Sequence, residues 1–332
     1  MAVRGTIAVI GAGLAGLSCA RTLRDAGQRV EVFERDGALG GRLRTERGDG
    51  VRYDSGAQYV TARTRDFKRF LDTLSLAGNV AGWKPRLSLG GANLAGEIAP
   101  QDWYVGAPGM GSMVRPLAED LTVTLNAPVT ALIRTEGKWY LRILDREDLA
   151  GPFHAVMVTS PAPEAYQLLA DHDDAFDDMT RVRMLPCWSV LLQFAEALPV
   201  SFDVGSRVSD AIAWVSRDSS KPNRRRKQEN WVMHAGPDFS REFLEDEPED
   251  VGLELWREWQ AHHNIDGIEP SVIVAHRWRY ALTERPLGAS CIFSRDTMLG
   301  AAGDWCLGSR AEAAHESATA LARRVKETLA AM

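Results

Sequence analysis

The chain has 332 residues, of which 45% are hydrophobic and 25% are charged, as in an ordinary globular protein long enough for two domains. The formal net charge of −6 argues against general nucleic-acid binding, which needs a basic surface. No apolar run approaches the roughly 20 residues of a membrane span, and the first apolar strand begins almost at the N-terminus. We therefore expect a cytoplasmic protein with neither a nucleic-acid nor a membrane partner.

The first motif, "IAVIGAGLAGLSCARTL", joins a predicted strand to a predicted helix. Residues 7–10 are a β-branched apolar run typical of a buried strand, and helical spacing follows over residues 14–23. Between them, Gly11 permits a tight turn, Gly13 lets a pyrophosphate approach the backbone, and Gly16 allows close helix–strand packing. The free N–H groups at the start of the helix favour the phosphates of a dinucleotide.

A second predicted strand, residues 30–33, ends at an acidic side chain. Glu34 lies about 20 residues past the glycines, where an acid that binds ribose is expected. A carboxylate there disfavours a 2′-phosphate, because two negative charges would meet. Strand, helix, second strand and acid together predict a dinucleotide-binding fold.

The next stretch distinguishes between nucleotides. "GALGGRLRT" places Gly40, Gly41 and Arg42 after the second strand, and "YDSGAQYVTAR" follows. A cofactor with a flavin beyond its pyrophosphate would use this second cradle, with Arg42 binding phosphate oxygens. We expect residues 54–58 to pass close to the flavin, so the motifs favour FAD over NAD.

At this point the sequence resembles the flavin-containing amine oxidase superfamily, in which a GG-R motif follows the first glycines. The C-terminal stretch "MLGAAGDWCLGSRAEAAHESATALARRV" reads as a strand, Gly303-Asp304, a turn and a helix. The resemblance implies that Asp304 binds the ribityl chain, that the helix N-terminus points at the flavin pyrimidine, and that Val129 lies on the adenine side.

Motifs and resemblance together assign a set of residues to FAD, bound non-covalently. They are Gly11, Gly13, Leu14, Ala15, Gly16, Glu34, Arg35, Gly41, Arg42, Ala57, Gln58, Val129, Gly303, Asp304, Arg310, Ala311 and Ala314. The four cysteines, Cys19, Cys187, Cys291 and Cys306, show no C-x-x-C pair, so we expect buried free thiols rather than a metal site, a disulfide framework or a covalent flavin link.

The predicted fold class is α/β: a Rossmann-type FAD-binding domain of the amine oxidase/p-hydroxybenzoate hydroxylase kind, with a second, mixed-sheet substrate domain of α+β character. Because the motifs stand at both ends of the chain, the FAD-binding domain is expected to be discontinuous. Its predicted segments are residues 1–75, 105–160 and 290–332, and the substrate domain takes residues 76–104 and 161–289.

Further motifs make the chain similar to the bacterial renalase family. They are "GAQYVTAR", "WYVGAPGMGSMVRPLA", an S-K-P loop, "WVMHA", "HRWRYA" and "GDWCLGSRAEAA". The resemblance implies that FAD accepts a hydride from the 2- or 6-dihydro isomers of NAD(P), giving NAD(P)+, and that O2 then reoxidises the flavin with release of H2O2. Such chemistry needs few catalytic side chains, because the cofactor performs the difficult step.

The expected walls of the substrate cavity are His276, Trp278, Tyr280, Trp231, Gln58 and Tyr59. Along residues 276–280 alternate side chains face opposite ways, and we favour the set containing His276 as the inward one. Plainer interpretations stay open: His276 as a hydrogen-bonded strand residue, and Trp231 and His234 as packing. The basic run 221–227 is either a solvated loop or an attractor for the phosphates of a dinucleotide.

Two rival functions and one departure from the family pattern stand beside this interpretation. The protein could be a flavin oxidase of a small amine, whose site typically needs an aromatic pair and a lysine near flavin N5; no lysine is identified for that place. It could also be a non-catalytic FAD-binding protein. In the C-terminal helix, alanines 313 and 318 stand where the family has glycine, and His315 stands where tryptophan is frequent, which is expected to alter the cavity floor.

Overall fold

The structure is a computed structural model that describes residues 5–48, 51–89, 102–224, 228–263, 265 and 267–331. The chain forms two compact units. The first unit comprises Met1–Gly41, Val114–Met184 and Thr283–Met332, and the second comprises Arg42–Met113 and Leu185–Leu282.

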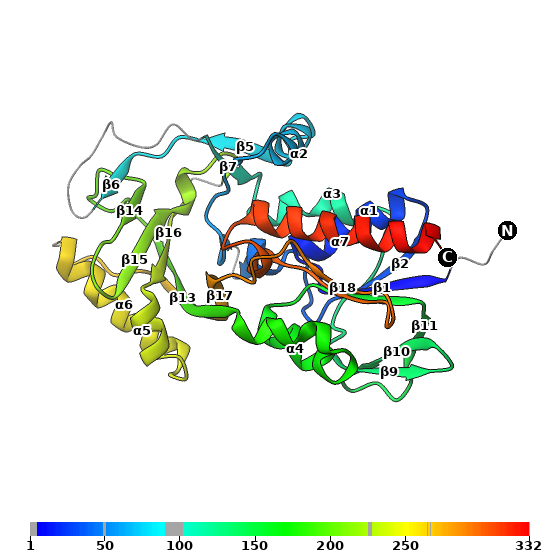
Figure 1. Cartoon of the computed structure of the whole chain (residues 1–332). Coiled ribbons are helices and arrows are strands. Elements are labelled where there is room, and N and C mark those ends of the chain that lie inside the picture. The colour runs from blue at the N-terminus through cyan, green and yellow to red at the C-terminus, as the bar shows by residue number, and fades with distance from the viewer. Residues whose placement is uncertain are drawn as a thin grey trace. The chain divides into compact units, whose positions relative to one another are not determined.

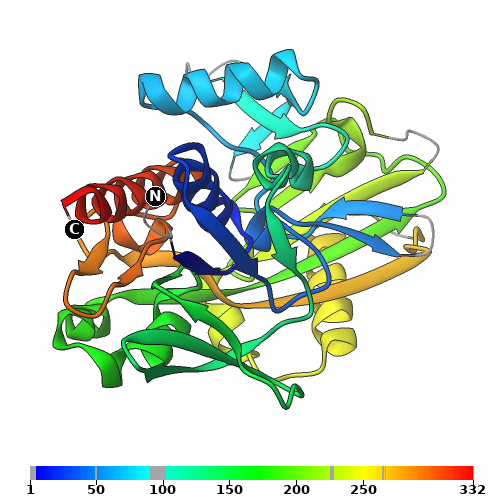
Figure 2. The same cartoon turned by 90° about the vertical axis from the view of Figure 1, so that its right-hand side faces the viewer.

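The first unit is built around a six-stranded sheet in the order β18-β19-β12-β1-β2-β8. The strands are β1 (Thr6–Ile10), β2 (Arg29–Phe33), β8 (Thr122–Thr124), β12 (Ala155–Val158), β18 (Ile292–Ser294) and β19 (Leu299–Ala301). All pairs are parallel except β18–β19, and β1 lies centrally between β2 and β12. Helices α1 (Leu14–Asp25) and α7 (Ala311–Ala331) pack side by side (Figure 1 and Figure 2).

A second, three-stranded sheet, β11-β10-β9, completes the first unit. Its strands are β9 (Val129–Thr135), β10 (Lys138–Ile143) and β11 (Ala150–Phe153), and the helices α3 (Arg115–Ala118) and α4 (Ala162–Leu169) belong to the same unit. The core combines residues of both sheets and α4, including Phe33 and Phe153, whose rings meet edge to face at 5.7 Å. This packing holds the carboxyl ends of β1 and β2, where the glycine turn and Glu34 lie.

The second unit contains a six-stranded sheet in the order β17-β13-β16-β15-β14-β6. The strands are β6 (Leu87–Leu89), β13 (Arg183–Phe194), β14 (Val204–Ser206), β15 (Ile212–Arg217), β16 (Glu229–Ala235) and β17 (Val272–Arg285). The other elements are β3 (Thr45–Gly48), β4 (Val51–Asp54), α2 (Arg65–Leu76), β5 (Val80–Trp83), β7 (Trp103–Gly106), α5 (Pro237–Glu242) and α6 (Pro248–His263).

The two faces of this sheet are different because side chains alternate along each strand. One face packs on α6 through an apolar core that includes Trp188, Trp231 and Trp256, and we call it the helix face. On the opposite face Leu191 and Val232 pack with Tyr53 of β4. We call this second side the open face, as a name for the side of the sheet opposite α6.

The fold class expected from the sequence is confirmed: a mixed α/β fold with a Rossmann-type unit and a mixed-sheet unit. The two units divide at other residues than expected, with 42–75 and 105–113 in the second unit and 161–184 and 283–289 in the first. The reason is packing, because Tyr53 joins the open face whereas α4 contributes Ala162, Ala165 and Leu169 to the first unit's core.

Within the described part of the chain, no helix combines the length and apolar character required to cross a membrane. The four cysteines are free and buried, and the described residues contain no group of three or more His, Cys, Asp or Glu side chains arranged to hold a metal ion.

Candidate functional site

The turn between β1 and α1 needs two of its glycines for the protein's own packing. Gly11 has a φ of +100°, and its N–H donates to the carbonyl of Phe33 over 2.8 Å. A Cβ on Gly16 would lie 1.8 Å from the carbonyl oxygen of Gly11. Neither position accepts a side chain, so the strand and the helix can approach as closely as a nucleotide-binding turn requires.

Gly13 is a different case, because the protein itself does not require a glycine there. Its φ of −77° and ψ of −176° suit any residue, and an added Cβ would meet no described atom closer than 3.8 Å. Gly13 caps α1, whose first turn holds no acidic residue, and it forms a parallel bridge with Gly40. The missing side chain leaves room above a positive helix end, which fits the pyrophosphate of a dinucleotide.

Glu34 closes the end of β2 next to this turn. Its side chain is buried; Oε2 accepts from the N–H of Ala12 over 2.6 Å and Oε1 from the N–H of Asp36 over 3.0 Å. Burial raises the pKa of Glu34 above its usual value, against the lowering effect of these two N–H donors. Arg35 instead points to Glu164 of α4, with Nη1 2.8 Å from Oε1.

The C-terminal motif sits at the start of α7. Asp304 is buried and accepts from the hydroxyl of Thr283 over 3.2 Å, while the N–H of Gly303 donates to Ser317 Oγ over 3.0 Å. Ala311 begins α7, and Ala311 and Ala314 are half-buried in its first turn, so small side chains surround this helix end. Arg310 precedes them as a half-buried residue, and Val129 packs beside the first unit's core.

Two side chains near this motif have structural roles. Cys306 is fully buried in the core, and burial raises the pKa of its thiol to about 12, so it remains protonated and does not suit a covalent flavin link. His315 Nδ1 lies 2.9 Å from Ser18 Oγ and joins α7 to α1. His315 thus has a structural role in the helix pair, and its expected effect on the cavity floor stays a prediction.

In the second unit, the backbone of Arg42 packs closely against the segment that follows β4 and is hydrogen-bonded to it. Arg42 Nη1 donates to the carbonyl of Ala281 over 2.9 Å, and the N–H of Ala57 donates to the carbonyl of Arg42 over 2.9 Å. A Cβ on Gly56 would lie 2.1 Å from the carbonyl oxygen of Arg42, so glycine is needed for this approach. The residues assigned to FAD are thus divided: Arg42, Ala57 and Gln58 in the second unit and the others in the first.

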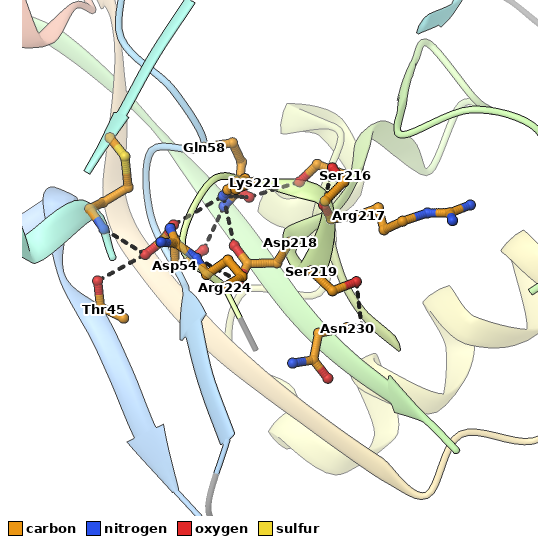
Figure 3. Close-up of polar contacts among 12 residues, drawn as sticks. Thr45, Asp54, Gln58, Ser216, Arg217, Asp218, Ser219, Lys221, Arg224 and Asn230 are labelled. Atoms are coloured by element: carbon orange, nitrogen blue, oxygen red, sulfur yellow. Dashed lines mark hydrogen bonds and ion pairs between the residues drawn. The ribbon is translucent and has the colours of Figure 1, made fainter. Parts of the chain in front are cut away.

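Next to that segment lies a buried lysine, which Figure 3 shows among its partners. Lys221 is 1% exposed. Its Nζ donates to Asp218 Oδ1 over 2.7 Å, to Asp54 Oδ2 over 3.0 Å and to Gln58 Oε1 over 3.0 Å. These bonds use all three N–H groups of the ammonium, so Lys221 holds the protein together and has no proton left for a substrate.

Arg224 and the two aspartates complete this buried ionic network. Arg224 Nη2 lies 2.6 Å from Asp54 Oδ2, and Nε lies 3.4 Å from Asp218 Oδ2. Asp54 Oδ1 accepts from the hydroxyl of Thr45 and the N–H of Met110, each over 2.8 Å. Burial raises the pKa of Asp54, but the two cations outweigh it and lower the pKa to about 2. Two cations balance two carboxylates, as buried charges require.

This network corrects the interpretation of the basic run 221–227 as a solvated loop or an attractor for phosphates. Lys221 and Arg224 turn inward toward Asp54 and Asp218, and residues 225–227 lie outside the described residues. Sequence reasoning missed the roles of Asp218, Lys221 and Arg224. The available signal was Asp218 three residues ahead of Lys221, which makes an ion pair at that spacing.

Gln58 belongs to the same network and is 3% exposed. Its Oε1 also accepts from Ser216 Oγ over 2.7 Å, and its Nε2 donates to the carbonyls of Asp54 and Gly56 over 2.5 and 3.0 Å. The side chain is engaged at both ends, so the structure does not present it as a wall. Its neighbour Tyr59 is half-buried and stacks on Trp103, with ring centroids 3.9 Å apart and planes at 9°.

On β17 the side chains alternate between the two faces. His276 and Trp278 lie together with ring centroids 4.4 Å apart, and Trp278 Nε1 donates to the carbonyl of Ser55 over 2.9 Å. Arg277 and Arg279 turn the other way and pair with Glu245 at 3.2 and 2.7 Å. His276 and Trp278 therefore share the open face. Tyr280 follows at the same alternation and is half-buried.

Trp231 was expected as a wall of the cavity, and this expectation is wrong. The side chain is fully buried on the helix face, with its ring centroid 5.0 Å from that of Trp259 and its Nε1 donating to Glu229 Oε1 over 2.7 Å. Alternation along β16 places Trp231 on the helix face, so Val232 and His234 occupy the open face.

Comparison with known proteins fits this geometry. Residues 87–325 match the family described as flavin containing amine oxidoreductase, and residues 9–74 match the NAD(P)-binding Rossmann-like domain. The chain belongs to the flavin-containing amine oxidoreductase family. Its cofactor is FAD, and the open position at Gly13, the α1 N-terminus and Glu34 are the features of the first unit that fit the nucleotide.

Individual relatives are similar over shorter stretches. Protoporphyrinogen oxidase 2 of Arabidopsis thaliana is 41% identical over 70 residues, which cover 21% of this chain and 14% of the relative. Putrescine oxidase of Kocuria rosea is 36% identical over 75 residues, 23% of this chain and 16% of the relative. The alignments thus span about a seventh of each curated relative.

The fold is also found in solved structures. A protein of Exiguobacterium sp. 255-15 described as a protoporphyrinogen oxidase superposes with a TM-score of 0.77 at 13% identity, over 97% of this chain and 99% of the other. This likeness establishes the fold. The family match thus places the chain among the flavin containing amine oxidoreductases.

Proposed function

We propose that the protein is an FAD-dependent oxidase of the 2- or 6-dihydro isomers of NAD(P), which forms NAD(P)+ and, with O2 as acceptor, H2O2. The sequence motifs shared with bacterial renalases support this assignment. The structural observation that supports it most is that the open face is aromatic. His276, Trp278 and Tyr59 present flat rings there. Flat aromatic surfaces suit a planar dihydropyridine ring.

The balance of the reaction explains why such a face is sufficient. A dihydropyridine loses one hydride, with its electron pair, and becomes an aromatic pyridinium without transferring a proton to the protein. FAD, when bound, supplies the two-electron acceptor. The chain's own residues need only bind the ring, orient it and exclude water. The network at Lys221 serves the same end by fixing residues 54–58, since each of its cations is bonded to its carboxylates.

A small amine is the second candidate substrate, favoured by the similarity to putrescine oxidase. An amine is a cation at neutral pH, so it must lose a proton before hydride transfer, and a free carboxylate would both bind the cation and accept that proton. The two buried carboxylates beside Lys221 are already paired with Lys221 and Arg224. Their pairing favours a substrate whose reacting ring is neutral and flat.

Oxygen consumption across a panel of donors separates these proposals. The purified protein, loaded with FAD, is mixed with 2- and 6-dihydro-NAD, 2- and 6-dihydro-NADP, ordinary NADH and putrescine. We expect rapid consumption with the 2- and 6-dihydro isomers and little with NADH or putrescine. Rapid turnover of putrescine alone would establish the amine oxidase, and no turnover with any donor would favour an FAD-binding protein without this activity.

A further inference from the structure

Two side chains of the open face stand directly beside each other on neighbouring strands. Trp214 of β15 and His234 of β16 are Cα partners in the antiparallel register. Side chains at such positions share a face and lie about 5 Å apart at Cβ. Both residues are half-buried, and the next open-face position of β15, Ser216, bonds to Gln58.

Each of these side chains has a buried nitrogen without a hydrogen-bond partner among the described residues. The atoms are Trp214 Nε1 and His234 Nε2. By contrast, the indole nitrogens of Trp188, Trp231 and Trp278 donate over 2.9, 2.7 and 2.9 Å. A buried polar atom without a partner is costly, and two side by side on a half-buried face indicate that a polar ligand completes them.

The chemistry of the two nitrogens specifies the ligand. An indole N–H can only donate a hydrogen bond. A neutral imidazole that carries its proton on Nδ1 presents a lone pair at Nε2, which accepts. Burial and the nearby Lys221 lower the pKa of His234 to about 4, against the raising effect of hydrogen bonding to the backbone of Ser55 and Gly56, so its ring is neutral at pH 7. A donor beside an acceptor matches a primary carboxamide, which offers one C=O and one NH2.

Aromatic rings border the same place. Trp214 lies with its ring centroid 5.6 Å from that of Tyr59 and 5.8 Å from that of Trp103, and those two rings are stacked on each other. All three are half-buried. A ring that bears the carboxamide would find a flat apolar border at this point.

We propose that Trp214 and His234 form the carboxamide subsite for a nicotinamide ring, Trp214 Nε1 donating to its C=O and His234 Nε2 accepting from its NH2. This inference rests on the proposed function, because it takes a nicotinamide dinucleotide as the ligand. It assigns the amide recognition to two open-face residues, and it leaves His276 to contact the ring.

Binding of the reaction product tests the subsite. NAD+ and nicotinic acid adenine dinucleotide, which has a carboxylate in place of the amide, are titrated into the FAD-loaded protein, and dissociation constants are read from the flavin absorption spectrum. The variants are Trp214→Phe and His234→Leu. The matched control is Trp259→Phe, which also removes an unpartnered indole N–H but from the helix face.

We expect each open-face variant to weaken NAD+ binding about fivefold, as the loss of one hydrogen bond predicts. His234→Leu also reduces the preference for the amide over the acid, because the lone pair that repels a carboxylate is gone. Trp259→Phe keeps the wild-type affinity and preference. FAD content and circular dichroism identify any variant that fails to fold, and His234→Gln, which keeps a polar group, then replaces His234→Leu.

Two results would overturn the inference, and they differ. If the wild type binds NAD+ and is reduced by a dihydronicotinamide, but both open-face variants bind like the control, the subsite is wrong while the function stands. If the wild type binds neither dinucleotide and no isomer reduces its flavin, the proposed function fails and the subsite fails with it.

Discussion

The first unit's nucleotide turn and the second unit's ionic network are both buried and polar, but they are built by opposite means. The turn uses backbone N–H groups, space left by Gly13 and one carboxylate, Glu34. The network uses four charged side chains whose bonds are all made to one another or to neutral groups nearby. The turn therefore leaves groups available to a ligand, whereas the network leaves none at Lys221.

This difference predicts which property a substitution in each region will change. The turn needs the cofactor to complete it, so its substitutions act on FAD affinity. The network is complete without a ligand, so its substitutions act on the stability of the second unit and on the positions of residues 54–58. Of the four predictions that follow, the first two separate these two kinds of effect, and the last two test the open face.

The largest expected effect is that of Lys221→Met. The change leaves Asp54 and Asp218 buried with Arg224 as their remaining cation, and breaking a buried pair in this way costs about 3–5 kcal/mol. Urea denaturation measures the loss, with Lys68→Met as the control on an exposed lysine, expected to change stability by less than about 0.5 kcal/mol. Adding Asp218→Asn should restore part of the stability. A loss below about 1 kcal/mol would mean that the network is not a structural unit.

Glu34→Ala tests the turn. If the carboxylate binds the ribose, the loss of this charge-assisted bond weakens FAD binding by about 1.5–3 kcal/mol, a factor of about 10 to 100. The dissociation constant is measured by titrating FAD into apoprotein, and Glu31→Ala on the same strand is the control. Equal affinities for wild type and Glu34→Ala would show that Glu34 serves only the N–H groups of Ala12 and Asp36.

The open face should show a pH dependence through His234. The folded-state pKa of about 4 lies below the ordinary value of 6.5, so protons bind preferentially to the unfolded chain. The folding stability that depends on a neutral His234 is fully present above pH 6.5 and declines as the pH falls toward 4. Between pH 7 and 5 the loss is about 2 kcal/mol.

Urea denaturation at several pH values measures this effect. His234→Gln should remove that part of the pH dependence, whereas His262→Gln, at an exposed histidine, should retain it. A wild-type profile that coincides with that of His234→Gln would place the imidazole in contact with water.

His276→Ala has the smallest expected effect. If His276 contacts the nicotinamide ring, flavin reduction slows about tenfold, the equivalent of about 1.4 kcal/mol of transition-state positioning. Reoxidation by O2 should stay unchanged, because that step needs no bound nicotinamide. Stopped-flow spectroscopy measures both half-reactions, and equal slowing of the two would assign His276 to support of the flavin or the fold.

The sequence predicts the first unit better than the second, for a physical reason. The glycine turn and Glu34 lie within 30 residues of one another and follow strand and helix periodicity, so local pattern is sufficient. The network joins Asp54 to Lys221 across 167 positions, and no local pattern predicts that contact. From the sequence alone, Lys221 and Arg224 are interpreted as part of a solvated loop, because their acidic partner Asp54 is remote in the chain.

The substrate face shows the same limit at the level of a single strand. Alternation predicts that neighbouring residues of β16 face opposite ways, but it does not say which set is buried. With ten tryptophans in the chain, Trp231 could line a cavity or pack in a core. Its packing against Trp259 shows that it belongs to the core. The division into two units depends on similar contacts, because Tyr53 finds its partners, Leu191 and Val232, far along the chain.

The measurement that tests the central claim most directly is an anaerobic single turnover. FAD-loaded protein is mixed with one equivalent of 6-dihydro-NAD, the flavin spectrum is followed, and the nicotinamide product is identified by chromatography. The account predicts rapid bleaching of the flavin with formation of one equivalent of NAD+, and slow or no bleaching by ordinary NADH. Bleaching by putrescine, with none by any dihydronicotinamide isomer, would contradict it.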